Sequence, residues 1–217
     1  MFEAFIRNHQ YNYIKKQVGI VQHALRTNPD PKILESVRDG AEAKILELFP
    51  AATDAQKEML GRFTALKTTE DFQKYVKDLE LYIVEFPQIT VKQIQKLFPK
   101  NKKLKLPDLV NIDFRFVTYL SWMDISTNKL FMVYHQNGQF LGIEGRYTPT
   151  NKKSYCFVCN RFEELVLYSA VSKTKPAKAS SDYYKAIGNY LCMNGRDCNK
   201  NIADVASLER FIHVVIG

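Results

Sequence analysis

The 217-residue sequence lacks a long hydrophobic run. Its most apolar stretch, Phe211 to Ile216, is interrupted by His213 and is much shorter than the roughly 18 to 20 residues that a membrane-spanning helix needs. The first ten residues, MFEAFIRNHQ, contain an early acid and no apolar segment followed by small residues, so they do not resemble a secretory signal. We therefore expect a cytoplasmic protein that has no membrane partner.

The familiar catalytic motifs are absent as well. The sequence has no G-x-x-x-x-G-K-[ST] phosphate loop, no G-x-G-x-x-G after a strand, no G-x-S-x-G elbow and no H-E-x-x-H helix. The four histidines fall in separate expected elements, with no carboxylate or nucleophile at a suggestive spacing: His9, His23, His135 and His213. These absences favour a binding protein, and we do not expect an enzyme.

The balance of charge is basic. Lys and Arg number 31 and Asp and Glu number 23, which gives a net charge of +8. Such an excess favours a polyanion or an acidic protein surface as the partner. Residues 1–105 carry 18 basic and 13 acidic side chains, and residues 106–217 carry 13 and 10, so by this division the excess is spread along the chain. An even spread argues against a dedicated nucleic-acid surface, and no direct nucleic-acid contact is expected.

The first hundred residues contain almost no strand signal. Apolar residues recur at three- and four-residue spacing, and caps or prolines separate the periodic segments. The pattern predicts one helix that stops at Asn28–Pro31, followed by helices over 31–48, 54–66, 69–83 and 91–98. We interpret residues 1–100 as a helical bundle domain.

A proline-bracketed basic segment, Pro99 to Pro107, is the expected domain boundary. Its lysines fit a solvated linker, with a phosphate-binding run as the alternative. Beyond it the apolar period changes to two, which predicts strands over 117–122, 129–134 and 139–143, the last two joined by an Asn137-Gly138 turn. Residues 107–217 are therefore expected to form a mixed α/β domain, and the whole chain an α+β protein of two domains.

All four cysteines lie in the last third of the chain. Cys156 and Cys159 form C-F-V-C, and Cys192 and Cys198 form C-M-N-G-R-D-C. Paired cysteines at such spacing in a reducing cytosol favour metal, and four thiolates suit Zn²⁺. Two strands, 165–171 and 183–191, are expected between the pairs, and a helical pattern follows from Ile202 to Ile212. A knuckle, a hairpin and a helix whose first turn brings the last ligand is the layout of a treble-clef zinc finger, here about residues 154–217.

Three other roles for these cysteines are weaker. Buried structural thiols would not need two close pairs. A redox C-x-x-C belongs beside a thioredoxin-like βαβ unit, which the sequence does not predict. A catalytic zinc keeps an open position for water, whereas four cysteines close the shell. We therefore expect one structural Zn²⁺ that supplies folding free energy.

The C-terminal half resembles a known family. The segments that carry the resemblance are T-Y-L-S-W-M-D (118–124), K-L-F-M-V-Y (129–134), G-I-E-G-R-Y-T-P-T-N-K-K (142–153), C-F-V-C (156–159), G-N-Y-L-C (188–192) and C-N-K-N-I (198–202). In combination they are similar to the FusB-type fusidic acid resistance proteins and the elongation factor G-binding proteins of Gram-positive bacteria. The helical first half and the length also match, so the resemblance covers essentially the whole chain.

The resemblance implies a function. Proteins of this family bind translation elongation factor G mainly through the zinc domain and speed its release from ribosomes locked by fusidic acid, without modifying the drug. It also implies that Cys156, Cys159, Cys192 and Cys198 are the zinc ligands. We expect a monomer that binds the factor one to one and meets the ribosome indirectly through it. The alternative function is a ribosome-associated RNA-binding zinc protein, for which treble clefs and positive charge are common.

Four residues are candidates for the contact with elongation factor G. Phe157 lies between two ligands, where a tight turn pushes side chains outward, although it can instead pack on its own sheet. Lys185 and Tyr190 on the second finger strand extend the same face, with Lys185 meeting an acidic patch. Phe211 on the last helix is the fourth candidate, but it shares the apolar stripe of Val205 and Leu208, which favours a core position.

Overall fold

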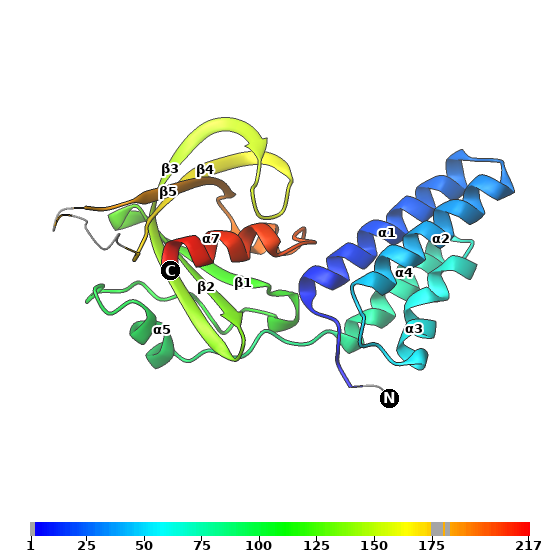
Figure 1. The fold of residues 1–217 in the computed structure, drawn as a ribbon, viewed down its shortest axis with the longest axis horizontal. Helices are drawn as coiled ribbons and strands as arrows, with labels where there is room; N and C mark the ends of the chain where they lie inside the picture. The colour runs from blue at the N-terminus through cyan, green and yellow to red at the C-terminus, as the bar shows by residue number, and fades with distance from the viewer. Residues whose placement is uncertain (1–2, 175–179, 181–182) are drawn as a thin grey trace. The chain divides into compact units, whose positions relative to one another are not determined.

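The fold was analysed in a computed structural model that describes residues 3–174, 180 and 183–217 (Figure 1). The chain divides into two compact units, residues 1–84 and residues 85–217. The first unit is helical and the second is built on an antiparallel sheet. The α+β architecture predicted from the sequence is therefore confirmed. Among the described residues, no helix has both the length and the apolar character that crossing a bilayer requires.

Within residues 3–84, the helical unit has four helices and two 3₁₀ turns. Its elements are α1 (Asn8–Thr27), α2 (Pro31–Glu47), α3 (Asp54–Gly61), η1 (Arg62–Ala65), α4 (Thr69–Asp78) and η2 (Leu79–Tyr82). Two helix starts have a clear local cause: the Asp30 side chain accepts a hydrogen bond from the Lys32 amide, and Thr53 forms a capping box with Gln56. A parallel bridge between Ile6 and Ile83 joins the two ends of the unit.

In the part of the second unit that the structure describes, the sheet is a five-stranded antiparallel meander in the order β1-β2-β3-β4-β5. Its elements are α5 (Val91–Leu97), η3 (Phe114–Phe116), β1 (Tyr119–Asp124), η4 (Ile125–Thr127), β2 (Lys129–Gln136), β3 (Gln139–Tyr155), β4 (Phe162–Val171), β5 (Ala186–Cys192), α6 (Gly195–Asn199) and α7 (Ala206–Ile216). Asn137 and Gly138 both have positive φ at the β2–β3 turn, as the two-residue hairpin signal predicts.

Both faces of β2 are buried, because a helix covers each one. Leu130, Met132 and Tyr134 belong to the same core cluster as the apolar face of α7. The alternate residues Phe131 and Val133 pack in a second cluster with α5. Figure 1 shows α7 and α5 beside the β1–β3 part of the sheet. This double cover explains why β2 is a continuous apolar run in the sequence instead of an alternating one.

The boundary between the units differs from the sequence prediction. Residues 91–98 do form a helix, but α5 belongs to the sheet unit and not to the helical bundle. Its residues Ile94 and Phe98 are buried against Leu120, Phe131 and Val133. The expected bundle domain of residues 1–100 therefore ends at Val84, and the sheet domain begins at Glu85 and not at residue 107. The helical period alone does not say which core a helix joins.

Two other elements also differ from expectation. The third strand continues twelve residues past Ile143 to Tyr155, with a register shift between Pro149 and Lys153 where it pairs with β4. Its polar second half gave no strand signal, because much of it is exposed. The last helix begins at Ala206 instead of Ile202, and the Asp204 carboxylate accepts a hydrogen bond from the Ala206 amide at this start. Most of the segment between the expected strands 165–171 and 183–191 lies outside the described residues.

Candidate metal centre and partner surface

Three segments bring the four cysteines together. Cys156 and Cys159 lie in the turn between β3 and β4, Cys192 is the last residue of β5, and Cys198 is on the short helix α6. The last ligand is therefore on a helix of its own and not on the first turn of the C-terminal helix. All four are free thiols and are buried, with exposed fractions of 9% or less.

The spacing of the sulfur atoms fits one tetrahedral ion. The four Sγ atoms all lie within 4.8 Å of one another. Cys156 Sγ is 3.9 Å from Cys198 Sγ, and Cys159 Sγ is 3.6 Å from Cys192 Sγ. Zn–S bonds of about 2.3 Å in a tetrahedron place neighbouring sulfurs about 3.8 Å apart, close to both distances. The described residues supply four sulfur donors, a set that fits a structural zinc ion.

The four sulfurs shift one another's pKa in opposite directions. Hydrogen bonds with Cys156 and the other sulfurs, together with burial, raise the pKa of Cys198 and Cys192 far above the ordinary thiol value. Hydrogen bonds with Cys159 and the other two sulfurs lower the pKa of Cys156. The hydrogen bond with Cys156 acts to raise the pKa of Cys159, but those with Cys192 and Cys198 lower it, and the net shift is downward. Two thiolates are thus favoured at the cost of the other two, and a metal ion would compensate the charge of all four.

The backbone around the first cysteine pair is a tight knuckle. The Cys156 amide donates to the Arg161 carbonyl at 2.9 Å, and the Asn160 amide donates to the Cys156 carbonyl at the same distance. Asn160 adopts a left-handed conformation with φ of 55°, which asparagine tolerates better than most residues. Backbone hydrogen bonds and the turn at Asn160 therefore help to position Cys156 and Cys159.

The fourth cysteine is held by an asparagine that the sequence analysis did not select. The Asn199 side chain accepts hydrogen bonds from the Thr118 and Tyr119 amides at 2.8 and 3.2 Å. It donates to the Tyr119 and Gly195 carbonyls at 2.8 and 3.0 Å. The residue is buried and ties α6, which carries Cys198, to the start of β1. An asparagine directly after a ligand, within C-N-K-N, was the only available signal.

Three of the four expected partner residues cluster near the knuckle. The Phe157 amide donates to the Tyr190 carbonyl at 2.9 Å, and the Phe157 ring lies 5.3 Å from the Phe211 ring. Tyr190 is 48% exposed and Phe157 is half-buried, so both present surface. Phe211 is only 4% exposed and also contacts Tyr168, so the core alternative describes it correctly and it is a support under Phe157.

The fourth expected partner residue, Lys185, lies elsewhere. It is exposed but precedes β5, five positions before Tyr190, which places the two residues about 16 Å apart along an extended chain. The knuckle instead has two aromatic neighbours that the sequence analysis did not select. Tyr155 and Phe162 face each other across β3 and β4 with ring centroids 5.2 Å apart, and they are 62% and 55% exposed. Aromatic side chains are enriched at protein interfaces, so this exposed pair is a candidate contact.

The chain matches two known protein families, one for each unit. Residues 5–87 match the family described as elongation factor G-binding protein, N-terminal, and residues 95–211 match the FBP C-terminal treble-clef zinc-finger family. A solved structure, that of the fusidic acid resistance protein FusC, superposes with a TM-score of 0.81 at 26% sequence identity and covers 97% of both chains. No curated protein matches. The chain therefore belongs to the FusB-type family of elongation factor G-binding and fusidic acid resistance proteins.

Proposed function

We propose that this protein binds elongation factor G through the sheet unit of residues 85–217, which holds the four cysteines and is called the zinc unit below. Binding promotes release of the factor from the ribosome, which gives resistance or tolerance to fusidic acid. The observation that carries the proposal is that both family matches fall on the two units of one fold, and the second includes a zinc-fixed knuckle bordered by exposed aromatic rings. The action is non-enzymatic, because binding energy is all that release requires.

The physical basis of release is differential affinity. A partner shifts a conformational equilibrium only to the extent that it binds one state more tightly than the other. The protein must therefore prefer a conformation of elongation factor G that cannot remain locked on the ribosome. A surface fixed by a closed metal site suits this task, since a rigid surface discriminates between two shapes of a partner better than one that adapts to both.

The binding experiment is copurification of the tagged protein with purified elongation factor G, with the mass of the complex measured by light scattering. We expect a one-to-one complex with a monomeric protein. Cys192→Ser should lose both zinc and binding, because it removes a ligand. Phe157→Ala and Tyr190→Ala should keep zinc and weaken binding at least tenfold, as expected for aromatic interface anchors. Leu81→Ser, at a 76% exposed position of the helical unit, is the matched control and should bind normally.

The release experiment measures how much elongation factor G remains on pelleted ribosomes with GTP and fusidic acid. Added protein should lower that amount, and the drug should be recovered chemically unchanged. Full binding by a zinc-free Cys192→Ser variant would contradict the role assigned to the zinc unit. Tight binding with no change in the ribosome-bound fraction would contradict the release mechanism.

A further inference from the structure

The unit boundary changes the distribution of charge. Residues 1–84 carry 12 basic and 12 acidic side chains, whereas residues 85–217 carry 19 and 11. The whole excess of +8 therefore belongs to the zinc unit, and the even spread inferred from the sequence was a product of dividing the chain at residue 105. Six lysines lie between Lys92 and Lys105, and no acid occurs between Glu85 and Asp108.

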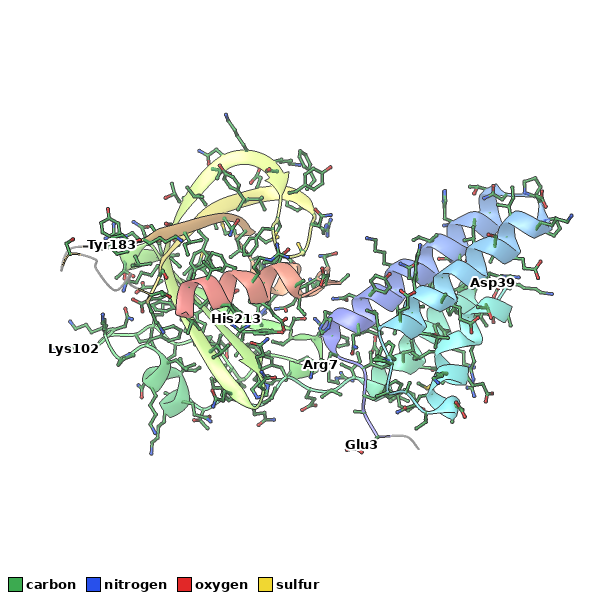
Figure 2. All side chains as sticks on the ribbon, in the orientation of Figure 1. Glu3, Arg7, Asp39, Lys102, Tyr183 and His213 are labelled. Atoms are coloured by element: carbon green, nitrogen blue, oxygen red, sulfur yellow. The ribbon has the colours of Figure 1, made fainter. Side chains whose placement is uncertain are left out.

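Five of these lysines form what we call the α5 lysine surface. Its members are exposed and are Lys92, Lys96, Lys100, Lys102 and Lys103. Lys92 and Lys96 are four residues apart on α5 and so share one face of that helix. Figure 2 places Lys102 on the loop that follows α5, at the margin of the unit. In the described part of the chain, no ion pair involves any of the five.

The segment that carries these lysines is held in place and is not a loose linker. Ile94 and Phe98 are buried, and Leu104 and Leu106 pack against the same cluster. Trp122 Nε1 donates a hydrogen bond to the Lys105 carbonyl at 2.7 Å. Fixed backbone under exposed lysines reduces the entropy lost when they meet a partner.

A partly buried network of hydrogen bonds and an ion pair also fixes the middle of the segment. The Asn101 side chain donates to Glu144 and accepts from Lys129 Nζ at 2.7 Å, and Lys129 pairs with Glu144 at 3.1 Å. Glu144 is thereby neutralised by a lysine of β2, so it is not available to offset the α5 lysine surface.

The composition of this surface favours phosphate over protein. Exposed positions of residues 91–105 hold lysine, glutamine, valine and proline, with no arginine and no aromatic side chain. Protein interfaces are depleted in lysine and rely on aromatic and arginine anchors. Lysines without such anchors neutralise phosphates as point charges and carry no base specificity. We infer that the α5 lysine surface binds the phosphate backbone of RNA without sequence preference, and thereby holds the protein on ribosomal RNA while its knuckle engages elongation factor G.

This inference rests on the proposed function for its ribosomal setting, but its test does not depend on elongation factor G. The probe is fluorescein-labelled oligo(U) RNA, and binding is followed by anisotropy over a range of salt concentrations. One variant changes all five lysines of the α5 lysine surface to glutamine. The matched control changes five exposed lysines of the helical unit to glutamine and so removes the same charge: Lys32, Lys44, Lys67, Lys74 and Lys77.

We expect the natural protein and the control variant to bind RNA alike. Single-stranded RNA gives a slope of about 0.7 per neutralised phosphate, so five contacts predict roughly a 100-fold loss of affinity between about 50 and 200 mM salt. The five-lysine variant should bind at least tenfold more weakly and lose most of that slope. Both variants should still copurify with elongation factor G.

Two results would overturn the inference. One is RNA binding by the five-lysine variant that equals that of the control. The other is a five-lysine variant that binds RNA as the natural protein does but no longer copurifies with elongation factor G. That result would assign the surface to an acidic protein instead. Absence of elongation factor G from all samples, including the natural protein, would contradict the proposed function and leave the RNA comparison independent.

Discussion

At the scale of single residues, the sequence predicts the metal ligands more readily than the residues that hold the ligands in place. Cysteine spacing alone predicts the four ligands, because few other arrangements use two close pairs. Asn199 has no such pattern: its importance comes from four hydrogen bonds to residues that are distant in sequence, including Thr118 and Tyr119. Phe157 is intermediate, since its exposure depends on how Phe211 packs beneath it.

Asn199→Ala tests this support. The change removes the acceptor for two buried amides and the donor for two carbonyls, and each buried group left unsatisfied costs about 1–3 kcal/mol. We expect the free energy of unfolding of the zinc-loaded protein to fall by about 3 kcal/mol in urea titrations. Asn201→Ala is the control, because Asn201 makes side-chain contacts at an exposed site and should cost less than about 1 kcal/mol. Equal losses in the two variants would contradict the role given to Asn199.

At the scale of elements, the sequence predicts which segments form helices and strands better than it predicts which elements pack against one another. Capped helices such as α2 and α3 follow from local chemistry at Asp30 and Thr53, and the β2–β3 turn follows from Asn137-Gly138. The placement of α5 depends instead on a close approach to β3. A Cβ at Gly142 would lie 2.8 Å from the Leu97 Cβ, so this glycine lets the helix and the strand meet.

Gly142→Ala should therefore destabilise the zinc unit. The added methyl forces α5 away from β3, and overpacking of this kind costs about 1–3 kcal/mol. Gly188→Ala on β5 is the matched control, because its Cβ would meet nothing closer than 3.5 Å. Unfolding can be followed by fluorescence of Trp122, the single tryptophan, which packs against Phe98 of this contact. A Gly142→Ala variant as stable as Gly188→Ala would refute the close-packing argument.

At the scale of the whole molecule, the two units have separate cores and different sources of stability. The helical unit relies on its apolar core, while the sheet unit adds a four-cysteine site to its core. The sequence predicted two domains of these classes, but it misplaced the boundary and therefore the charge. Periodicity reports that a segment is helical, whereas membership of a unit is decided by tertiary contacts such as those of Ile94 and Phe98.

Removal of the metal should unfold the zinc unit and leave the helical unit folded. A chelator such as EDTA at mildly raised temperature should abolish the native Trp122 fluorescence, because a structural zinc site contributes folding free energy directly. Helical circular dichroism from residues 1–84 should largely remain, since that unit contains no ligand. Added Zn²⁺ should restore the fluorescence. Simultaneous loss of both signals, or no effect on Trp122, would contradict independent stabilisation.

The position of the cysteines also has a consequence for the order of folding. Cys156 and Cys198 are 42 residues apart, and Cys159 and Cys192 are 33 apart, with β4 and β5 between them. The C-x-x-C pair can capture Zn²⁺ while the chain is still extended, but the shell closes only after β5 has paired and α6 has formed. Closing loops of this length restricts the unfolded chain, as a disulfide would. Complete coordination of the ion therefore requires that β5 and α6 are already in place.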